Sequence, residues 1–378
     1  MLGRMQLQMT LTLRSDPRRD GYWMPAEFEP HEGTWMLWPE RPDNWRSQAR
    51  PAQQAFAAVA AAIARFEPVT VGASPQQYVR ARAALPARSV RVVELSGADA
   101  WMRDTGPSFV VNQAGDVRGV HWRFNAWGGL YRDHRLDDTV AQKVLELAGA
   151  ARYCAAFVNE GGAIHVDGQG TVMVTEQCLL NRNRNPTMTR AGIEAMLRRY
   201  LNVRSVIWLG EGVIEDETSG HIDNLACFAR PGEVCLTWCD DRNDPQYRVS
   251  ADAYERLMDA RDARGRRLKV HKLVSPGPLY MSRREAAGLA SGTAIRPLRA
   301  GTRLAASYAN FYFANGAVIV PMLDRRTDAT VRRQLRAIFP QRRIVGVDAR
   351  EILLGGGDIH CIVQQQPARI RRRSVALP

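Results

Sequence analysis

The chain has 378 residues, 52 basic against 39 acidic side chains, and a formal net charge of +13. No unbroken run of about 18 apolar residues and no apolar leader occur, so we expect a cytoplasmic protein without a membrane partner. The cations are dispersed and nearly all arginine, with lysine only at Lys143, Lys269 and Lys272, which argues against a nucleic-acid partner.

Helices and β-hairpins are predicted to alternate along the chain. The helices show apolar residues at a period of 3.6, and each hairpin pairs two apolar or β-branched runs across a turn rich in Gly, Asn, Asp or Pro. This alternation predicts an α/β fold made of repeated units. In chain order the elements are a helix at Pro51–Phe66, a hairpin at 108–120, a helix at Asp138–Leu147, a hairpin at 163–175, a helix at Thr189–Leu201, a hairpin at 224–238, a helix at Ala251–Ala263, a hairpin at 311–321 and a helix at Ala329–Ile338.

The domain organisation follows from the absence of a linker. Length alone permits two domains, yet no stretch rich in proline, glycine or serine divides the chain. We expect a single domain at 21–367, preceded by a poorly ordered or variable segment at 1–20 and followed by a basic tail at 368–378.

Four glycine-bordered strings carry candidate site residues. Asp104 lies in WMRDTGP, Glu160 in NEGG, and His221 with Asp223 in DETSGHID, each just before or at the first strand of a hairpin. Cys361 follows GGGDIH and is expected to begin a similar strand. Matching positions of repeats arranged around an axis converge on that axis, so we expect these five residues to share one pocket. Taken singly, each string is equally well explained as a turn.

These residue types favour chemistry on a guanidinium group. Three carboxylates would repel the oxyanion of an amide hydrolase, whereas they match the N–H fork of a planar cation. We expect Cys361 to be the nucleophile and Asp104 and Asp223 to clamp the guanidinium. His221, two residues before Asp223 on an extended segment, would face the same side as that acid and serve as acid and base. Glu160 would bind substrate or orient His221.

Three further expectations concern protonation and ligands. The neighbouring carboxylates should raise the pKa of Cys361, so that the cationic substrate itself generates the thiolate. His360, adjacent to Cys361 on a strand, should point to the opposite face, and it is read as a structural residue, as is His165. No metal and no cofactor are expected, because the acids and His221 are dispersed singly and the six cysteines lack CxxC spacing.

Eight strings, in order, make the chain resemble agmatine deiminases, a family of the guanidine-modifying pentein-fold enzymes related to bacterial peptidylarginine deiminase. The resemblance covers nearly the full length. The strings are TWMLWPERPDNWR (34–46), WMRDTGPSFVVN (101–112), WRFNAWGG (122–129), NEGGAIHVDGQGT (159–171), TEQCLLNRNRNP (175–186), DETSGHIDNLACF (216–228), SYANFYFANG (307–316) and GGGDIHCIVQQQP (355–367).

The resemblance implies a five-bladed, pseudo-symmetric α/β propeller, the pentein fold, with one catalytic deiminase domain at 21–367. It implies hydrolysis of a C–N bond, converting agmatine to N-carbamoylputrescine and ammonia on a route to putrescine. It also implies a homo-oligomer, a dimer or higher.

The resemblance also assigns roles to residues of this chain. Cys361 would form a covalent amidino intermediate, with His221 as acid and base and Asp104, Glu160 and Asp223 holding the guanidinium. Two further substrate-binding positions follow in the same way. Glu217 would bind the distal ammonium, and Trp101 would wall the alkyl chain.

The chain departs from the family pattern at three positions. It has Asp358 where the family has asparagine, Ser219 where it has aspartate and Asn159 where it has leucine. Two alternatives stay open: a deiminase or amidinotransferase of free or peptidyl arginine, which would need a pocket arginine, and an inactive arginine-rich binding protein of the same fold, which would have a damaged catalytic set.

Overall fold

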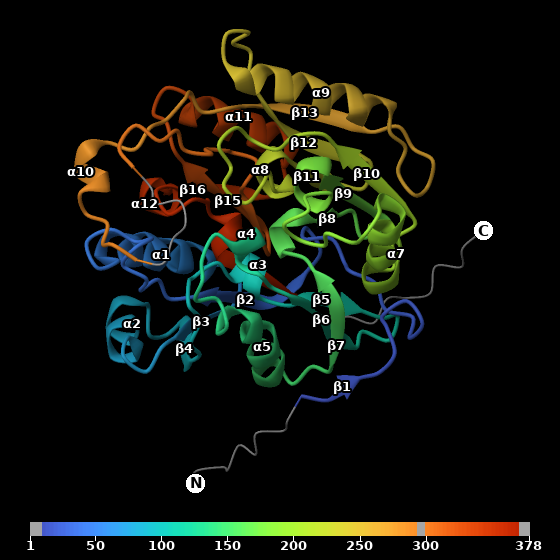
Figure 1. Cartoon of the computed structure of the whole chain (residues 1–378), viewed down its shortest axis with the longest axis horizontal. Coiled ribbons are helices and arrows are strands. Elements are labelled where there is room, and N and C mark those ends of the chain that lie inside the picture. The colour runs from blue at the N-terminus through green and yellow to red at the C-terminus, as the bar shows by residue number, and fades with distance from the viewer. Residues whose placement is uncertain (1–9, 293–298, 370–378) are drawn as a thin grey trace.

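The computed structural model describes residues 10–292 and 299–369. Within these ranges the strands form five sheets, and the mixed α/β class that the sequence predicts is confirmed. Each sheet contains an antiparallel pair of strands and a third strand that is parallel to the second. A parallel neighbour requires a crossover connection, and a helix supplies it in each of these sheets. Figure 1 shows the long crossover helices toward the outside of the view and short helices near its middle.

The first two sheets each gain a fourth strand. One has the order β17-β2-β3-β4 and the other the order β1-β7-β6-β5. Their strands are β2 (His31–Leu37), β3 (Val69–Ala73), β4 (Val90–Glu94) and β17 (Val363–Pro367), then β1 (Thr12–Leu13), β5 (Ser108–Val111), β6 (Val117–Arg123) and β7 (Arg152–Val158).

The other three sheets have three strands each. The third sheet contains β8 (His165–Val166), β9 (Thr171–Thr175) and β10 (Ser205–Leu209). The fourth contains β11 (Ala226–Arg230), β12 (Glu233–Trp238) and β13 (Lys269–Val274), and the fifth contains β14 (Tyr312–Ala314), β15 (Ala317–Met322) and β16 (Arg343–Asp348). The four predicted hairpins are therefore confirmed as β5–β6, β8–β9, β11–β12 and β14–β15.

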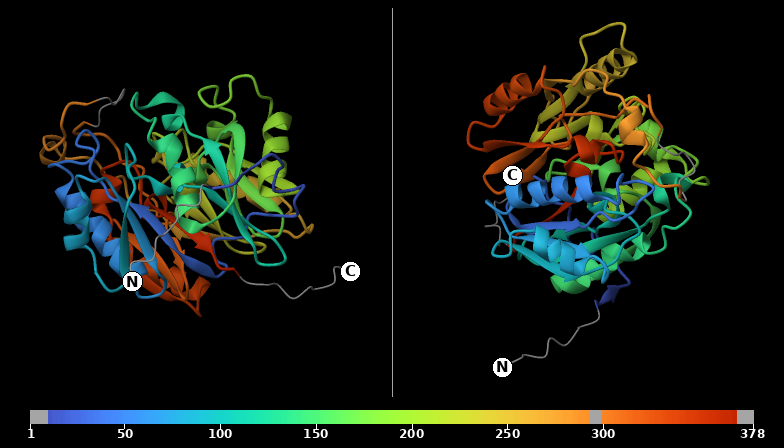
Figure 2. Two further views of the ribbon diagram at one scale, coloured as in Figure 1. Left: turned by 90° about the horizontal axis from the view of Figure 1, so that it is seen from below. Right: turned by 90° about the vertical axis from the view of Figure 1, so that its left-hand side faces the viewer.

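A fifth antiparallel pair joins the two ends of the chain. β17 pairs with β2, with Val363 opposite Met36 and Gln366 opposite Gly33. Hairpin signals in the sequence cannot reveal this pair, because no short turn connects its strands. In Figure 2 the red strands from the end of the chain lie beside the blue strands from its beginning.

The five crossover helices bury one face against the sheets. They are α1 (Arg50–Ile63), α5 (Val140–Ala148), α7 (Arg190–Leu201), α9 (Pro245–Asp259) and α11 (Asp328–Ile338). All five helices predicted from periodicity are present. The prediction for α9 began at Ala251, six residues late, because the Asp244 side chain accepts the Gln246 N–H at 2.9 Å and Pro245 occupies the first turn. A side-chain cap and an N-terminal proline begin this helix before its apolar pattern does.

Several shorter helices complete the fold. Among them, α3 (Met102–Thr105) packs on both η2 (Gly161–Ala163) and η3 (His360–Ile362), and α8 (Ile222–Leu225) packs on η2. These four turns carry the candidate site. The others are α2 (Tyr78–Ala84), α4 (Ala126–Gly129), η1 (Asp137–Thr139), α6 (Glu176–Leu179), α10 (Arg283–Ala286) and α12 (Arg350–Leu353).

The ends of the chain bear on the predicted boundaries. Within the segment predicted at 1–20, β1 pairs with β7 and Asp16 is buried, while residues 1–9 lie outside the described residues. Of the predicted tail, residues 370–378 also lie outside them. In the described ranges, no helix combines the length and the apolar character that crossing a bilayer would take.

Candidate active site

The five predicted residues are brought together by short helical turns. Asp104 lies in α3, His221 is the N-cap of α8 and Asp223 lies within it. Glu160 directly precedes η2. The turns meet at the backbone of Gly162, where a Cβ would lie 2.5 Å from His221 Nδ1 and 2.9 Å from both Asp104 Oδ1 and Asp223 Oδ2. Only a residue without a side chain fits between these three groups.

The expected reason for the proximity of His221 and Asp223 is wrong. The segment is not extended, because α8 begins at Ile222 and Asp223 is its second residue. His221 has extended dihedral angles as the N-cap, and the helical turn that follows carries the acid around to the same site. A single turn of helix, rather than the alternation of a strand, therefore places both groups.

Cys361 also lies on a helical turn and not on a strand as expected. It is the central residue of η3, and β17 begins two residues later at Val363. Its Sγ lies 3.7 Å from Asp223 Oδ2 and 3.3 Å from Asn310 Nδ2. The thiol thus touches one of the two acids that the sequence assigns to the substrate clamp.

The two acids of the expected clamp are held in different ways. Asp104 accepts the Gly162 N–H and the Trp127 indole N–H, both at 2.9 Å. Asp223 Oδ2 lies 2.9 Å from His360 Nδ1, while its Oδ1 has no hydrogen-bond partner within the described part of the chain. Burial raises the pKa of Asp104, whereas the hydrogen bond and charge of His360 outweigh burial and lower the pKa of Asp223.

Glu160 is already paired with a cation. Arg184 Nε donates to Glu160 Oε1 at 2.8 Å, and both side chains are fully buried. Arg184 also donates to the Thr218 carbonyl at 2.7 Å. Burial would raise the pKa of Glu160, but Arg184 and then His221 outweigh it and lower the pKa. Of its two expected roles, this arrangement favours orienting His221, because Glu160 Oε2 lies 3.7 Å from His221 Nε2.

His221 sits between two acids. Its Nδ1 lies 3.8 Å from Asp104 Oδ1, and its Nε2 faces Glu160 on the other side. Burial opposes the charged imidazolium, yet Asp104 and Glu160, together with a contact to Cys178, raise the pKa of His221 well above its ordinary value. These surroundings favour the protonated imidazole, the form that can donate a proton.

The expected direction for the thiol is confirmed, with a different leading cause. The pKa of Cys361 lies well above its ordinary value, chiefly because the group is buried, and then because of the charges of Asp223 and Asp104. The empty site thus holds a neutral thiol beside a protonated His221.

A pH titration of alkylation tests this assignment. In the empty enzyme, iodoacetamide should react with Cys361 along a curve whose apparent pKa lies above the value of about 8.5 for a free thiol. A guanidinium compound that binds without reacting should lower the apparent pKa of Cys361, because a nearby cation stabilises the thiolate. The ultraviolet absorbance of the thiolate should then appear at a lower pH than in the empty enzyme. The Cys361→Ala variant supplies the background from Cys154, which is exposed. A depressed pKa without ligand would contradict the substrate-assisted mechanism.

A narrow cavity opens onto Cys361 and Asp104. Trp101, Trp127 and Glu217 also line it, so both positions expected from the family resemblance, Trp101 and Glu217, face the nucleophile's cavity. Among the described residues, no arginine lines this cavity. Gly356 closes one side with φ +110° and lies against Glu217 Oε1, a place where a Cβ would not fit.

The three departures from the family pattern do not line this cavity. Asp358 and Asn159 are fully buried. Burial raises the pKa of Asp358 well above its ordinary value, and the charge of Asp223 adds to the effect, so these surroundings favour the neutral carboxyl. Ser219 Oγ accepts from Arg184 Nη1 at 3.4 Å and thereby supports the cation that holds Glu160.

Sequence reasoning assigned no role to several residues of the site. Arg184, Trp127 and Asn310 contact the expected site residues, and His360 was read as a structural residue pointing away from the site. That reading of His360 is wrong, since its ring and the Cys361 thiol reach the same carboxylate oxygen. Each of these residues lies within a string that carries the family resemblance, and this was the available signal.

Among the described residues, two groups of side chains have the composition of a metal site. Glu160, Cys178 and His221 form one, and Glu27, His165 and His360 form the other. In the first group Glu160 is ion-paired with Arg184, and the surroundings of His221 favour its protonated form, so these groups are poor ligands for a metal cation.

Known proteins resemble the chain over nearly its whole length. The family model described as Porphyromonas-type peptidyl-arginine deiminase matches residues 23–367. The agmatine deiminase of Stutzerimonas stutzeri (strain A1501) is 57% identical over 362 residues, covering 94% of this chain and 98% of that protein. The solved agmatine deiminase of Enterococcus faecalis gives a TM-score of 0.92 at 46% identity, covering 96% of this chain and 100% of that chain. An agmatine deiminase of C. jejuni gives a TM-score of 0.77 at 27% identity, covering 91% and 96%.

Proposed function

The chain belongs to the Porphyromonas-type peptidyl-arginine deiminase family, and from this premise we propose that it is an enzyme hydrolysing agmatine to N-carbamoylputrescine and ammonia. The observation that carries the choice of substrate is the cavity at Cys361, which contains the carboxylates of Asp104 and Glu217 and, among the described residues, no arginine. Agmatine is cationic at both ends, whereas arginine carries a carboxylate that would need a cation there. The curated relatives of the same length are agmatine deiminases, which supports the same substrate.

The acids bind and orient the guanidinium. Asp223 Oδ1 and the carboxylate of Asp104 accept its N–H groups, so the planar carbon lies against Cys361 Sγ. Binding a cation beside the thiol offsets the negative field of the two acids and favours the thiolate. The substrate thereby lowers the pKa of the group that attacks it.

The reaction proceeds in two balanced halves. The Cys361 thiolate forms a bond to the guanidinium carbon, and the C–N bond to one terminal nitrogen breaks as His221 gives that nitrogen a proton and ammonia leaves. A water then adds to the amidino carbon of the S-linked intermediate and gives a proton to His221. As the C–S bond breaks, its electron pair returns to sulfur as the thiolate, the new hydroxyl gives its proton to water, and the neutral ureido product is released. The proton that the thiol loses when the substrate binds likewise passes to water. Glu160, held by Arg184, keeps the His221 ring oriented through both halves.

The far end of the substrate meets Glu217, and Trp101 covers the methylene chain. A carboxylate at this end selects a primary ammonium over a carboxylate by charge alone. From the family resemblance we further propose that the product lies on a route to putrescine and that the enzyme acts in the cytoplasm.

The five sheets support a finer description of the fold. We take them as the blades of a pseudo-symmetric pentein propeller, because each repeats the same pattern of strands and crossover helix and the site lies where short turns of several repeats meet. A homo-oligomeric assembly, a dimer or higher, is proposed with it on the strength of the family resemblance.

A substrate panel tests the proposed function. Purified enzyme should release ammonia and a ureido product from agmatine, and far less from arginine or a blocked arginine peptide. Glu217→Gln should raise the KM for agmatine by about tenfold or more with a smaller change in kcat, because one charge-assisted hydrogen bond is worth roughly 1.5–3 kcal/mol.

A control variant tests the role of Glu217, and the substrate panel tests the choice of agmatine. Glu211→Gln changes a surface acid paired with Arg248 and should leave both constants unchanged. Turnover of arginine in place of agmatine would favour the arginine deiminase alternative, and no turnover of any guanidine would leave only a binding protein.

A further inference from the structure

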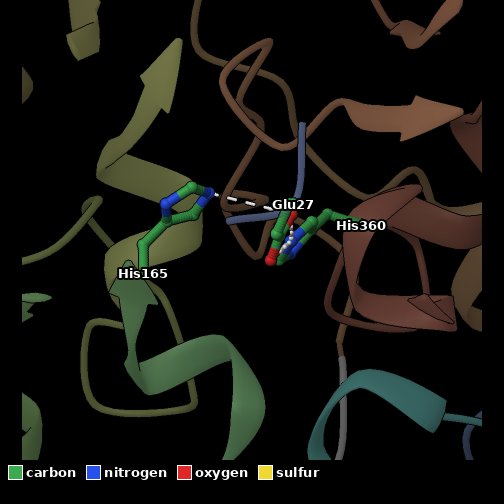
Figure 3. A group of neighbouring side chains, drawn as sticks. All are labelled: Glu27, His165 and His360. Atoms are coloured by element: carbon green, nitrogen blue, oxygen red, sulfur yellow. Dashed lines mark hydrogen bonds and ion pairs between the residues drawn. The ribbon is translucent and has the colours of Figure 1, made fainter. Parts of the chain in front are cut away.

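Behind the active site lies a buried set of ionisable side chains that the proposed reaction does not use. Glu27, Arg103, His165 and His360 are each no more than about 2% exposed. Figure 3 shows the carboxylate of Glu27 against the ring of His360, with His165 facing it from another side. The three drawn residues come from segments far apart in the sequence. Burying ionisable groups costs free energy that their contacts must offset. The groups that they contact therefore indicate the role of the cluster.

The two imidazoles are in different protonation states. His165 Nδ1 accepts the Phe228 N–H at 3.3 Å, so its proton is on Nε2, which faces Glu27 at 3.7 Å. Burial lowers the pKa of His165 to about 4. His360 has a carboxylate at each ring nitrogen: Asp223 Oδ2 lies 2.9 Å from Nδ1, and Glu27 Oε2 lies 2.8 Å from Nε2. A ring between two carboxylates is placed to donate from both nitrogens, and despite burial these acids raise the pKa of His360 above its ordinary value, which favours the imidazolium.

These partners argue against a metal site at Glu27, His165 and His360. A metal ligand must offer a lone pair, and both nitrogens of His360 and Nε2 of His165 point protons at Glu27 or Asp223. Arg103 Nη1 also donates to Glu27 at 3.0 Å and fills the place of a cation. The cluster is balanced without an ion, since two carboxylates face one guanidinium and one imidazolium.

The contacts of this cluster lead to the active site. His360 holds Oδ2 of Asp223, the same oxygen that lies 3.7 Å from Cys361 Sγ, and leaves Oδ1 without a hydrogen-bond partner among the described residues. Arg103 Nε donates to the His360 carbonyl at 3.3 Å, which ties α3 to η3. Oδ1 is therefore the oxygen that the proposed binding mode assigns to the guanidinium.

We propose that Glu27 and His360 form a positioning pair that keeps Asp223 ionised and turned so that one oxygen faces the substrate. This inference deepens the proposed function and rests on it, since the substrate is the guanidinium assigned there. Glu27 keeps His360 charged, and His360 in turn offsets the burial of Asp223. Besides His360, the positive charges of His221 and Arg103 also lower the pKa of Asp223. The other titratable groups that interact with this carboxylate carry no such charge, and they are Asp104, Cys361, Asp358, His165 and Cys227.

His360→Asn tests the pair by removing the charge while keeping an N–H donor near the position of Nδ1. The pKa of Asp223 should rise, and the acid limb of kcat/KM against pH should move upward by about one unit or more. Because Asp223 binds only when ionised, KM at neutral pH should rise by about tenfold for each unit by which its pKa exceeds the pH. His165→Asn is the matched control: it removes an equally buried histidine that stacks on His360 at 6.2 Å but does not touch Asp223.

Stability alone cannot produce this result. A merely structural role predicts that both variants lose thermal stability and keep the pH profile of the wild type, and that outcome would overturn the proposal. NMR spectra of ¹⁵N-labelled histidine test the pair without measuring turnover and without replacing His360. In the wild type, one imidazolium should not titrate around neutral pH, and in Glu27→Gln the same ring should titrate there. Unchanged histidine resonances in that variant would also overturn the pair. If the wild type failed to turn over agmatine, the proposed function would fall while these spectra still decided the protonation of His360.

Discussion

Replacing Cys361 by alanine is expected to lower kcat on agmatine by about 10⁴- to 10⁶-fold, the scale seen when a covalent nucleophile is removed. The reason is geometric as well as chemical. No other described cysteine lines the cavity with Asp104, so no second thiol can substitute. Binding should survive, because the acids that hold the guanidinium are untouched, and calorimetric titration with agmatine should give a Kd close to the wild-type KM.

Two observations accompany the rate measurement. Cys227→Ala alters a buried thiol of another core cluster and should keep full activity. Acid-quenched wild-type enzyme should carry, on Cys361, the mass of agmatine less ammonia. Ureido product formed by Cys361→Ala at a rate near that of the wild type would remove the covalent step from the mechanism.

Replacing Arg184 by methionine is expected to lower the free energy of unfolding by about 3–5 kcal/mol, the cost of leaving one member of a buried ion pair alone. Methionine fills a similar volume, so the loss comes from charge and hydrogen bonding. Glu160 would lose its contact at 2.8 Å, and the Thr218 carbonyl would lose a donor. The midpoint of urea unfolding measures the change. Arg190→Met, on the half-exposed pair with Glu176, is the control and should cost less than about 1 kcal/mol.

The pH dependence of the loss in unfolding free energy caused by Arg184→Met identifies the cause of that loss. In the wild type the folded pKa of Glu160 lies below the unfolded value, so its contribution is present above that value and is lost as pH falls through the folded pKa. Without Arg184, burial should raise the folded pKa, and the penalty grows as pH rises from about 4.3, the ordinary pKa of a glutamate. The deficit should therefore be largest at neutral pH and smaller in acid. A deficit independent of pH would indicate lost packing instead.

Local pattern in the sequence was sufficient for the hairpins and the helices. Turn residues between β-branched runs located β5–β6, β8–β9, β11–β12 and β14–β15, and apolar periodicity located the five crossover helices. These signals depend on neighbours along the chain. The antiparallel pair of β17 with β2 has no such signal, because its strands lie at opposite ends of the chain and no short turn joins them.

The chemical identity of the site was also present in the sequence. A cysteine, a histidine and three acids in glycine-bordered strings indicated a thiol acting on a guanidinium. The backbone conformation predicted for these residues was wrong, since His221, Asp223 and Cys361 lie at short helical turns and not on strands. Side-chain alternation along a strand therefore could not place the imidazole, the acid or the thiol. The same assumption predicted that His360 points away from the site, whereas its ring contacts the carboxylate of Asp223.

The sequence by itself determined which groups are available for reaction: one thiol, one imidazole and the acids, at positions that resemble those of a known family. Only the tertiary structure decided their partners and their pKa shifts. It pairs Glu160 with Arg184 and Asp223 with His360, and it raises the pKa of the Cys361 thiol. The physical reason is that a pKa depends on burial and on charges within a few ångströms. Those distances join residues up to hundreds of positions apart, which no local pattern records.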